Sequence, residues 1–260
     1  LMKTSGAAVL SREVASVLDN PTISRLKEMK LTTMAHMMSE PDHTLLELSF
    51  EERFSLMVER EWISRKNNRI KRLLNSANLS QNACLEDIRY SDDRNIDKKI
   101  IQTLSTGSYI HQFLNVIVCG KTGAGKSFLA CALGNNACRQ GHTVRSFRMP
   151  ELLLEIQDAK AERRYSKYMS QLLKIKLLIL DDIGLKSYTL EESRDILEII
   201  ENRYNKASII MVGQISYTRW YELFPDPTLA DAIMDRIIHN AYIISLDSKK
   251  SMREVMAGEL

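Results

Sequence analysis

The sequence is poor in cysteine, and its few cysteines have no spacing that would bind zinc. The 260 residues include only Cys84, Cys119, Cys131 and Cys138. None belongs to a CxxC pair or has a histidine at ligand spacing, which argues against both a zinc site and a disulfide framework. We expect these thiols to be reduced residues of the core.

Long apolar runs and a strong excess of charge are also missing. No segment approaches the ~18 consecutive apolar residues of a membrane span. The N-terminal stretch has no basic region followed by an apolar run and a small-residue cleavage site. The formal net charge of +3 is too small to indicate a nucleic acid partner by itself. We therefore expect a cytoplasmic protein without a membrane partner, and local charge clusters must decide on nucleic acid.

What the sequence does contain is two kinds of pattern in succession. Residues 1–21 are small and polar and are predicted to form a flexible leader. In residues 22–78 apolar side chains recur at helical spacing, which predicts a small all-helical N-terminal domain for DNA or partner docking, with Ser49 and Glu52 as a capping box. In residues 79–260 a polar linker leads into short Val, Ile and Leu runs that alternate with helices. This alternation indicates an α/β domain whose parallel sheet is covered on both faces by helices.

The helix predicted after Ser49 becomes strongly basic toward its end. Arg65, Arg69 and Arg72 recur at i, i+4 and i+7 and so form one stripe of the helix. This stripe has two interpretations, either a surface that binds DNA phosphates or a solvated helix face balanced by the glutamates earlier in the segment. The cations are Arg65, Lys66, Arg69, Lys71 and Arg72, and the glutamates are Glu51, Glu52, Glu59 and Glu61.

The segment GKTGAGKS matches the phosphate-binding pattern G-x-x-x-x-G-K-[ST]. It follows the apolar run Val116–Cys119 and precedes an amphipathic helix, which is the context that this pattern requires. Its glycines let backbone N–H groups surround a phosphate at a helix N-terminus. Lys126 is predicted to reach the β- and γ-phosphates of ATP, and the Ser127 hydroxyl to bind Mg²⁺. The predicted nucleotide-binding loop is Gly120, Lys121, Thr122, Gly123, Ala124, Gly125, Lys126 and Ser127.

The segment LLILDDIG ends an apolar run on two adjacent carboxylates, Asp181 and Asp182. Buried carboxylates need a cation or solvent. Because ligands of a parallel sheet bind beyond the carboxyl ends of its strands, Asp181 is predicted to hold Mg²⁺ and Asp182 to polarise the attacking water as general base. The alternative for Asp182 is a cap on the turn before Gly184.

These motifs occur together with LKEMKL, LSFEER, FLACALG, ACRQG, ENRYNKASIIMVGQ, DPTLADAIMDR and SMR. The combination resembles the IstB-like transposition helper ATPases of insertion sequences, a branch of the AAA+ proteins near DnaA and DnaC. The resemblance covers nearly the whole chain after the leader. It implies an AAA+ P-loop fold with a parallel five-stranded sheet, and ATP-dependent assembly of a homo-oligomer on duplex DNA, with ATP at the subunit interfaces. It also implies that the protein recruits or stimulates a transposase.

The resemblance assigns three further roles. Gln214 matches the first sensor, which orients the lytic water, and Arg236 matches the arginine finger offered to the nucleotide of an adjacent subunit. Arg253 is a weaker match to the second sensor, which contacts ATP. The alternatives are that Gln214 satisfies a strand end, that Arg236 pairs with Asp231 or Asp235, and that Arg253 is a surface charge.

A second basic cluster lies between the second strand and LLILDD, in a region that faces DNA in related initiator-type ATPases. It consists of Lys160, Arg163, Arg164 and Lys167. Phosphate contacts of this kind predict little sequence preference. The chain is thus predicted to be a Mg²⁺-dependent ATPase of insertion-sequence transposition. A DnaC-like helicase loader with the same ATPase core, and a small-molecule kinase with the same phosphate loop, are the alternatives.

Overall fold

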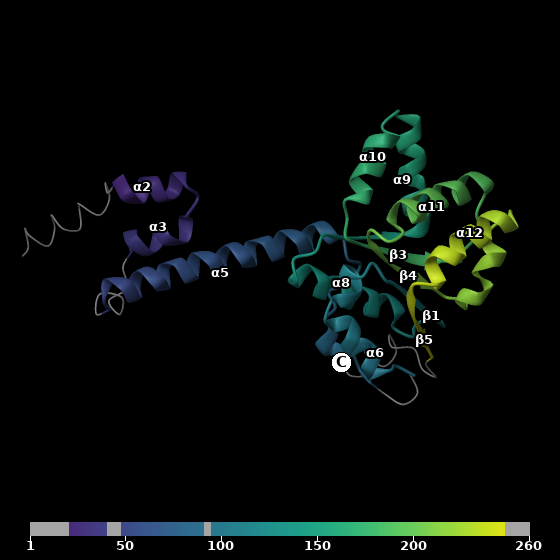
Figure 1. Cartoon of the computed structure of the whole chain (residues 1–260), viewed down its shortest axis with the longest axis horizontal. Helices are drawn as coiled ribbons and strands as arrows, with labels where there is room; N and C mark the ends of the chain where they lie inside the picture. Colours follow the sequence, from purple (N-terminus) through teal and green to yellow (C-terminus); the bar gives the residue numbers. More distant parts are fainter. Residues whose placement is uncertain (1–20, 41–47, 91–94, 248–260) are drawn as a thin grey trace, which may run out of the picture. The chain divides into compact units, whose positions relative to one another are not determined.

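The computed structural model describes residues 21–40, 48–90 and 95–247, and the chain divides into two compact units, Leu1–Arg69 and Ile70–Leu260 (Figure 1). Nearly all of the predicted leader and Arg253 lie outside the described residues. The predicted domain boundary after residue 78 stays a prediction. No helix in the described residues is long and apolar enough to cross a membrane.

The first unit is helical. Helices α2 (Pro21–Glu28) and α3 (Thr32–Ser39) pack on the N-terminal part of α5 (Phe50–Ala77). The buried side chains of this small core include Ile23, Leu26, Met34 and Ala35, with Met57 of α5 packed against them. The apolar residues whose helical spacing predicted these helices are therefore the residues on the buried face of each helix.

Two glutamates organise α5. The predicted capping box is confirmed, because the Ser49 N–H donates to Glu52 over 2.9 Å and the Glu52 N–H donates to the Ser49 hydroxyl over 3.3 Å. Further along, the buried Glu61 carboxylate accepts the N–H groups of Thr33 and Met34 at 2.8 and 3.2 Å. Because these donors belong to the first turn of α3, Glu61 satisfies groups that a helix leaves without intrahelical partners.

The second unit is built on a five-stranded parallel sheet. Its order is β2-β3-β4-β1-β5, and every paired strand runs parallel to its neighbour. The strands are β1 (Asn115–Gly120), β2 (Val144–Arg148), β3 (Leu177–Ile183), β4 (Ser208–Gly213) and β5 (Ala241–Leu246). Four of them are mainly apolar runs, whereas β2, with the sequence VRSFR, alternates apolar and polar side chains. The predicted α/β class and the five-stranded sheet are thus confirmed.

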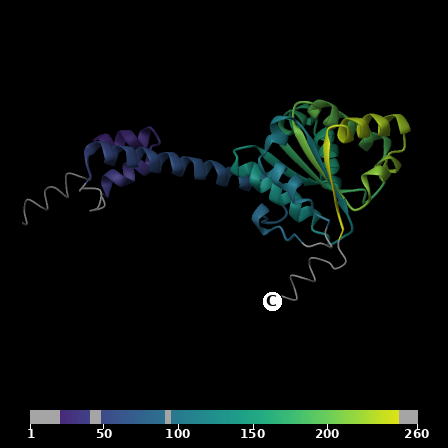
Figure 2. The ribbon, with the colours of Figure 1, turned by 60° about the horizontal axis from the view of Figure 1, so that its bottom comes forward.

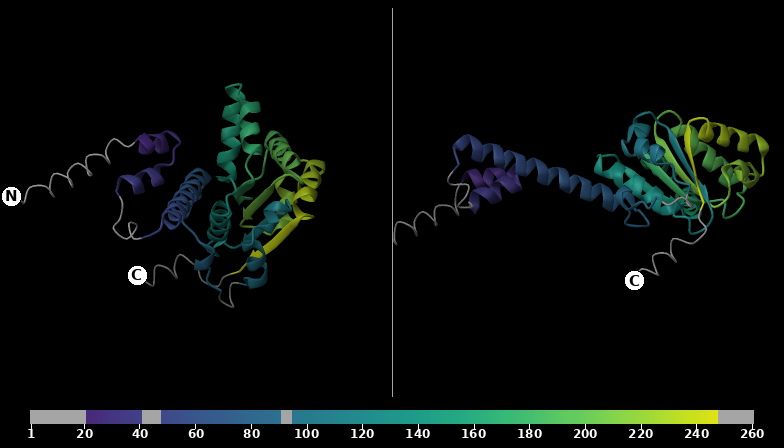
Figure 3. Two further views of the ribbon diagram at one scale, coloured as in Figure 1. Left: turned by 60° about the vertical axis from the view of Figure 1, so that its left-hand side comes forward. Right: turned by 90° about the horizontal axis from the view of Figure 1, so that it is seen from below.

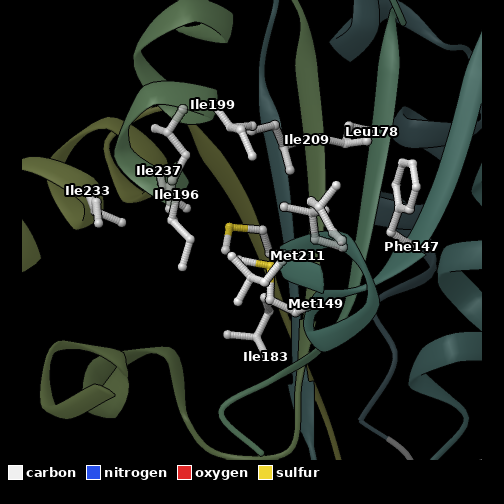
Figure 4. Close-up of a cluster of buried hydrophobic side chains, with 14 of the residues drawn as sticks. Phe147, Met149, Leu178, Ile183, Ile196, Ile199, Ile209, Met211, Ile233 and Ile237 are labelled. Atoms are coloured by element: carbon white, nitrogen blue, oxygen red, sulfur yellow. The ribbon is translucent and has the colours of Figure 1, made fainter. Parts of the chain in front are cut away.

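Helices cover both faces of this sheet (Figure 2). One buried cluster joins the sheet to α9, α10, α11 and α12, and another joins it to α6, α7, α8 and the end of α5. Figure 4 shows part of the first cluster, in which Met211 of β4 lies beside Met149 of α9, and Ile196 of α11 and Ile233 of α12 belong to the same cluster. The helices are α6 (Lys98–Ser105), α7 (Ser108–His111), α8 (Lys126–Arg139), α9 (Met149–Ala161), α10 (Tyr165–Leu173), α11 (Leu190–Arg203) and α12 (Pro227–Ile238).

Short elements complete the unit. The 3-10 helix η1 (Leu85–Asp87) lies between α5 and α6, and η3 (Tyr217–Leu223) lies between β4 and α12. Helices α9 and α10 lie side by side as a hairpin between β2 and β3 (Figures 1 and 3). The cysteines are free thiols, and all except the half-buried Cys84 are buried, as the sequence predicted.

Candidate nucleotide-binding site

A cavity of about 190 Å³ lies at the carboxyl end of the sheet. Three parts of the second unit form its walls: the phosphate loop with the start of α8, the ends of β3 and β4, and the segment before α6. The lining residues are Gln81, Asp87, Arg89, Thr122, Gly123, Gly125, Lys126, Ser127, Phe128, Asp181, Asp182, Val212, Gly213 and Gln214. Ligand sites of parallel sheets occur at these strand ends, and the predicted phosphate loop, Asp181, Asp182 and Gln214 all contribute to the lining.

The phosphate loop has the backbone conformation that its glycines permit. Gly123 and Gly125 have φ of 83° and 87°, a region that side chains with a Cβ rarely adopt. At Gly120 an added Cβ would lie 2.0 Å from the carbonyl oxygen of Leu246 in β5. The loop therefore turns tightly against β5 and delivers the N-terminus of α8, which favours anions, to the cavity wall.

Lys126 is the cation that the phosphate loop contributes to this cavity. Its side chain is mostly buried, and its Nζ donates to the carbonyl oxygen of Lys121 over 2.9 Å. Burial lowers the pKa of Lys126, while the nearby Asp181 carboxylate opposes this shift. A buried ammonium bonded to a neutral carbonyl gains more from an anionic partner, which a phosphate supplies.

The adjacent carboxylates Asp181 and Asp182 both line the cavity, although successive side chains of a regular strand point to opposite faces. The register of β3 against β4 shifts between Leu180 and Ile183, and Asp182 has a φ of 62°. Aspartate tolerates this left-handed conformation better than most residues. The irregularity turns both carboxylates to the same side, and the Asp182 N–H donates to Asp181 Oδ1 over 2.7 Å.

Asp182 also has a cationic partner that the sequence analysis missed. The Nε of Arg148, at the end of β2, donates to Asp182 Oδ2 over 2.6 Å. Arg148 pairs in register with Asp181 on the neighbouring strand. The ion pair therefore joins the ends of β2 and β3. Through it the guanidinium of Arg148 holds the carboxylate of Asp182, which is the one predicted to act on water.

Gln214 follows β4 and lines the same cavity. Its Oε1 accepts the Thr122 hydroxyl over 2.9 Å, which links the end of β4 to the phosphate loop. The contact is with a side chain of the loop rather than with a backbone group at the strand end. Its amide nitrogen therefore remains available as a donor toward the cavity.

The predicted Mg²⁺ ligands Ser127 and Asp181 are both brought to the cavity. Within the described residues, no three His, Cys, Asp or Glu side chains gather as a metal site. One hydroxyl and one carboxylate fit Mg²⁺ at a nucleotide site, because this ion takes few protein ligands and completes its shell with phosphate and water oxygens.

Arg236 lies away from this cavity, near the C-terminus of α12. Its guanidinium donates to the Ala232 carbonyl over 2.8 Å and pairs with Glu201 over 2.9 Å. Its backbone carbonyl accepts from Asn115 at the start of β1, whereas the phosphate loop follows the end of β1. Asp235, which the sequence offered as a partner for Arg236, instead lies 3.0 Å from Nε2 of His239. Arg236 therefore lies at the amino ends of the strands, whereas the phosphate loop of its own chain lies at their carboxyl ends.

The α9–α10 cluster is partly neutralised. Lys160 contacts Glu191 and Asp195 over 2.9 and 2.8 Å, and Arg164 pairs with Glu162. Arg163 and Lys167 are exposed at the turn of the hairpin and the start of α10. These two cations are therefore the more accessible members of the cluster.

The cations of α5 differ from one another in their surroundings. Arg65 donates to Glu61 over 2.7 Å and to the Lys30 carbonyl over 2.8 Å, while Lys66 lies over the Trp62 ring. The two later arginines, Arg69 and Arg72, also interact with neighbours, and Lys71 is exposed. Arg65 thus takes part in holding the first unit together, in addition to its predicted role in DNA binding.

The fold and the site together define the class of this protein. A parallel sheet of order β2-β3-β4-β1-β5, a phosphate loop after β1 and two carboxylates near the end of β3 are the features of a P-loop ATPase of the AAA+ class. More narrowly, the chain belongs to the family described as IstB-like ATP binding protein, which matches residues 24–257. The resemblance inferred from the sequence is confirmed.

Individual relatives agree with this assignment. The chain is 38% identical over 239 residues to y4pL of Sinorhizobium fredii, named as an insertion sequence ATP-binding protein, with 91% of this chain and 98% of the relative covered. It is 37% identical over 200 residues to an ATP-binding protein named for insertion sequence IS1162 of Pseudomonas fluorescens, with 75% and 85% covered.

Solved structures support the fold. The crystal structure of DnaI matches with a TM-score of 0.55 at 18% identity, over 68% of this chain and 93% of that one. AMPPCP-bound DnaA from Aquifex aeolicus matches with a TM-score of 0.56 at 16% identity, over 70% and 55%. The predicted kinship of the ATPase fold with replication initiators and loaders is confirmed at the level of architecture.

Proposed function

We propose that this protein is a DNA-binding helper ATPase of insertion-sequence transposition, which assembles on duplex DNA and recruits or stimulates a transposase. The observation that supports it best is the single cavity that collects Lys126, Ser127, Asp181, Asp182 and Gln214 from the loop and two strand ends. The names of its relatives, which refer to insertion sequences, supply the biological setting.

The roles in hydrolysis follow from the positions in the cavity. The loop N–H groups and Lys126 hold the phosphates, and Mg²⁺ bound by Ser127 and Asp181 would neutralise charge on the β- and γ-phosphates. Gln214 orients the water with its amide. The Asp182 carboxylate accepts the proton of that water as its oxygen bonds to the γ-phosphorus and the bond to ADP breaks. Asp182 must first exchange its ion pair with Arg148 for a hydrogen bond to water.

The location of Arg236 supports a shared site. Arg236 lies at the opposite end of the strands from the phosphate loop of its own chain. It can therefore meet a nucleotide only on a neighbouring subunit. Its pair with Glu201 then opens, and the guanidinium stabilises charge on the transferred phosphoryl group. This arrangement makes ATP part of the interface of a homo-oligomer. The second-sensor role of Arg253 stays a prediction.

DNA binding is assigned to the exposed cations of the two basic clusters. Arg163 and Lys167 are the first choice, with Lys71 and its neighbours on α5 as the second. Such contacts neutralise phosphates and carry little sequence preference. Lys160 contributes less, since two carboxylates already balance its charge.

The test is the ATPase rate with and without duplex DNA, measured beside oligomer size. We expect DNA to stimulate hydrolysis, Lys126→Ala to lose ATP binding and assembly together, and Asp182→Asn to assemble on DNA but hydrolyse slowly. Hydrolysis by Asp182→Asn at the wild-type rate would contradict the general-base role.

Two outcomes would replace the proposed function. A pull-down that recovers a replicative helicase and no transposase would favour a DnaC-like loader. Phosphate transfer to a metabolite, without stimulation by DNA, would favour a small-molecule kinase.

A further inference from the structure

The nucleotide cavity has a wall that belongs neither to the phosphate loop nor to the strand ends. Gln81, Asp87 and Arg89 form this wall, and Phe128 of α8 lines the cavity beside them. The loop and the carboxylates account for phosphates, metal and water, but a nucleotide also carries a base and a ribose. The wall is available for these remaining parts.

This segment is fixed in position by its other residues. Ala83 is fully buried against α8, and Ile88 is buried in the core cluster that α8 shares with the sheet. Between them, Cys84 accepts a hydrogen bond from Arg139 of α8 over 3.2 Å, and Glu86 pairs with Arg139 over 3.4 Å. The apolar and paired residues thus face α8, and the remaining polar side chains are left at the cavity.

Gln81 and Asp87 have unused hydrogen-bonding capacity. Both are exposed, and in the described part of the chain neither side chain has a hydrogen-bond or ion-pair partner. A glutamine amide offers one donor group beside one acceptor, which matches the adenine amino group and ring nitrogen. Guanine presents two acceptors on the same edge and fits this amide less well. A carboxylate accepts hydrogen bonds from ribose hydroxyls, and an aromatic ring such as Phe128 stacks on any base.

We propose that Gln81 recognises the adenine edge and Asp87 the ribose hydroxyls, so that this segment sets the nucleotide specificity of the ATPase. The inference rests on the proposed function, because it assumes a triphosphate in the phosphate loop. It assigns a binding role to a segment whose sequence resembles an ordinary polar linker.

The experiment measures binding of unlabelled ATP, GTP, 2′,3′-dideoxy-ATP and inorganic tripolyphosphate, each with Mg²⁺, to the full chain by calorimetry. Wild type should prefer ATP to GTP roughly tenfold, the discrimination of one good bidentate contact. Gln81→Ala should lose that preference through weaker ATP binding, with affinity for GTP and tripolyphosphate unchanged. Asp87→Asn should weaken ATP but not dideoxy-ATP.

The matched control is Asn82→Ala, which removes an exposed amide next to Gln81 that does not line the cavity. It should leave all four affinities at the wild-type values. The inference is overturned if Gln81→Ala keeps the wild-type ratio of ATP to GTP affinity, or if it weakens tripolyphosphate equally. A wild type that binds neither ATP nor tripolyphosphate would instead overturn the proposed function, and this inference with it.

Discussion

The ion pair between Arg148 and Asp182 predicts a variant that hydrolyses ATP faster than wild type. Arg148 Nε lies 2.6 Å from Asp182 Oδ2, so the proposed general base is engaged before it can accept a proton from water. Replacing Arg148 with alanine removes this competing partner. If the pair must open in each catalytic cycle, its free energy is part of the activation barrier.

The expected size of the effect follows from exposure. The Arg148 side chain is 57% exposed and that of Asp182 is 23% exposed, so solvent screens the pair. Exposed ion pairs contribute about 0.2–1 kcal/mol, and the short distance favours the upper end of this range. Removing about 1 kcal/mol from the barrier raises the rate roughly fivefold.

The assay is the single-turnover rate of ATP hydrolysis on DNA, at saturating enzyme. Arg148→Ala should be roughly fivefold faster, whereas Arg219→Ala, which breaks the exposed pair with Glu222 outside the cavity, should match wild type. The double variant Arg148→Ala with Asp182→Asn should be as slow as Asp182→Asn alone. A slower Arg148→Ala enzyme would show that Arg148 assists catalysis, and the reasoning about a competing ion pair would be refuted.

Three further predictions concern the first unit, the subunit interface and the DNA contacts. Although burial acts to raise the pKa of Glu61, the hydrogen bonds from Arg65, Met34 and Thr33 lower it below its ordinary value of 4.5. The contribution of Glu61 to stability is therefore complete above about pH 4.5 and is lost as pH falls through the lower folded-state pKa. Glu61→Ala should destabilise the unit by roughly 1–2 kcal/mol in urea unfolding at pH 7, against no change for the exposed Glu59→Ala; equal stability of Glu61→Ala and wild type would contradict this. Arg236→Ala and Lys126→Ala should each be inactive alone, but their mixture should recover part of the ATPase rate, because the intact loop of one subunit meets the intact arginine of the other. A mixture without activity would argue against a shared site. Arg163→Ala and Lys167→Ala should each reduce the slope of log K against log salt for duplex DNA by about 0.9, and an unchanged slope in both variants would exclude that cluster.

Much of the second unit could be predicted from sequence, because its signals are local. Four of the five strands are short, mainly apolar runs, and the phosphate loop is defined by eight consecutive residues. The position of Asp181 follows from the rule that ligands bind at the carboxyl ends of parallel strands. The Ser49 and Glu52 capping box is likewise contained in four residues.

What sequence could not supply were contacts between segments far apart in the chain. The pairing of Arg148 with Asp182 depends on β2 lying next to β3, and an arginine at the end of one strand gives no sign of which strand is its neighbour. The position of Gln81 and Asp87 at the cavity depends on how buried residues between them pack on α8. The turn of both carboxylates to one side depends on an irregularity of β3 that no pattern of residue types encodes.

The separation of Arg236 from the phosphate loop of its own chain has a consequence for activity per molecule. In the proposed assembly, Arg236 of one subunit meets the phosphate loop of the next, so the contact joins two different surfaces. Such a heterologous contact forms either a closed ring or an open helical filament. In an open filament one terminal chain always lacks a donor, and the number of complete catalytic centres is one fewer than the number of chains. Short assemblies would then turn over fewer nucleotides per chain than long ones, which makes the ATPase rate a measure of filament length.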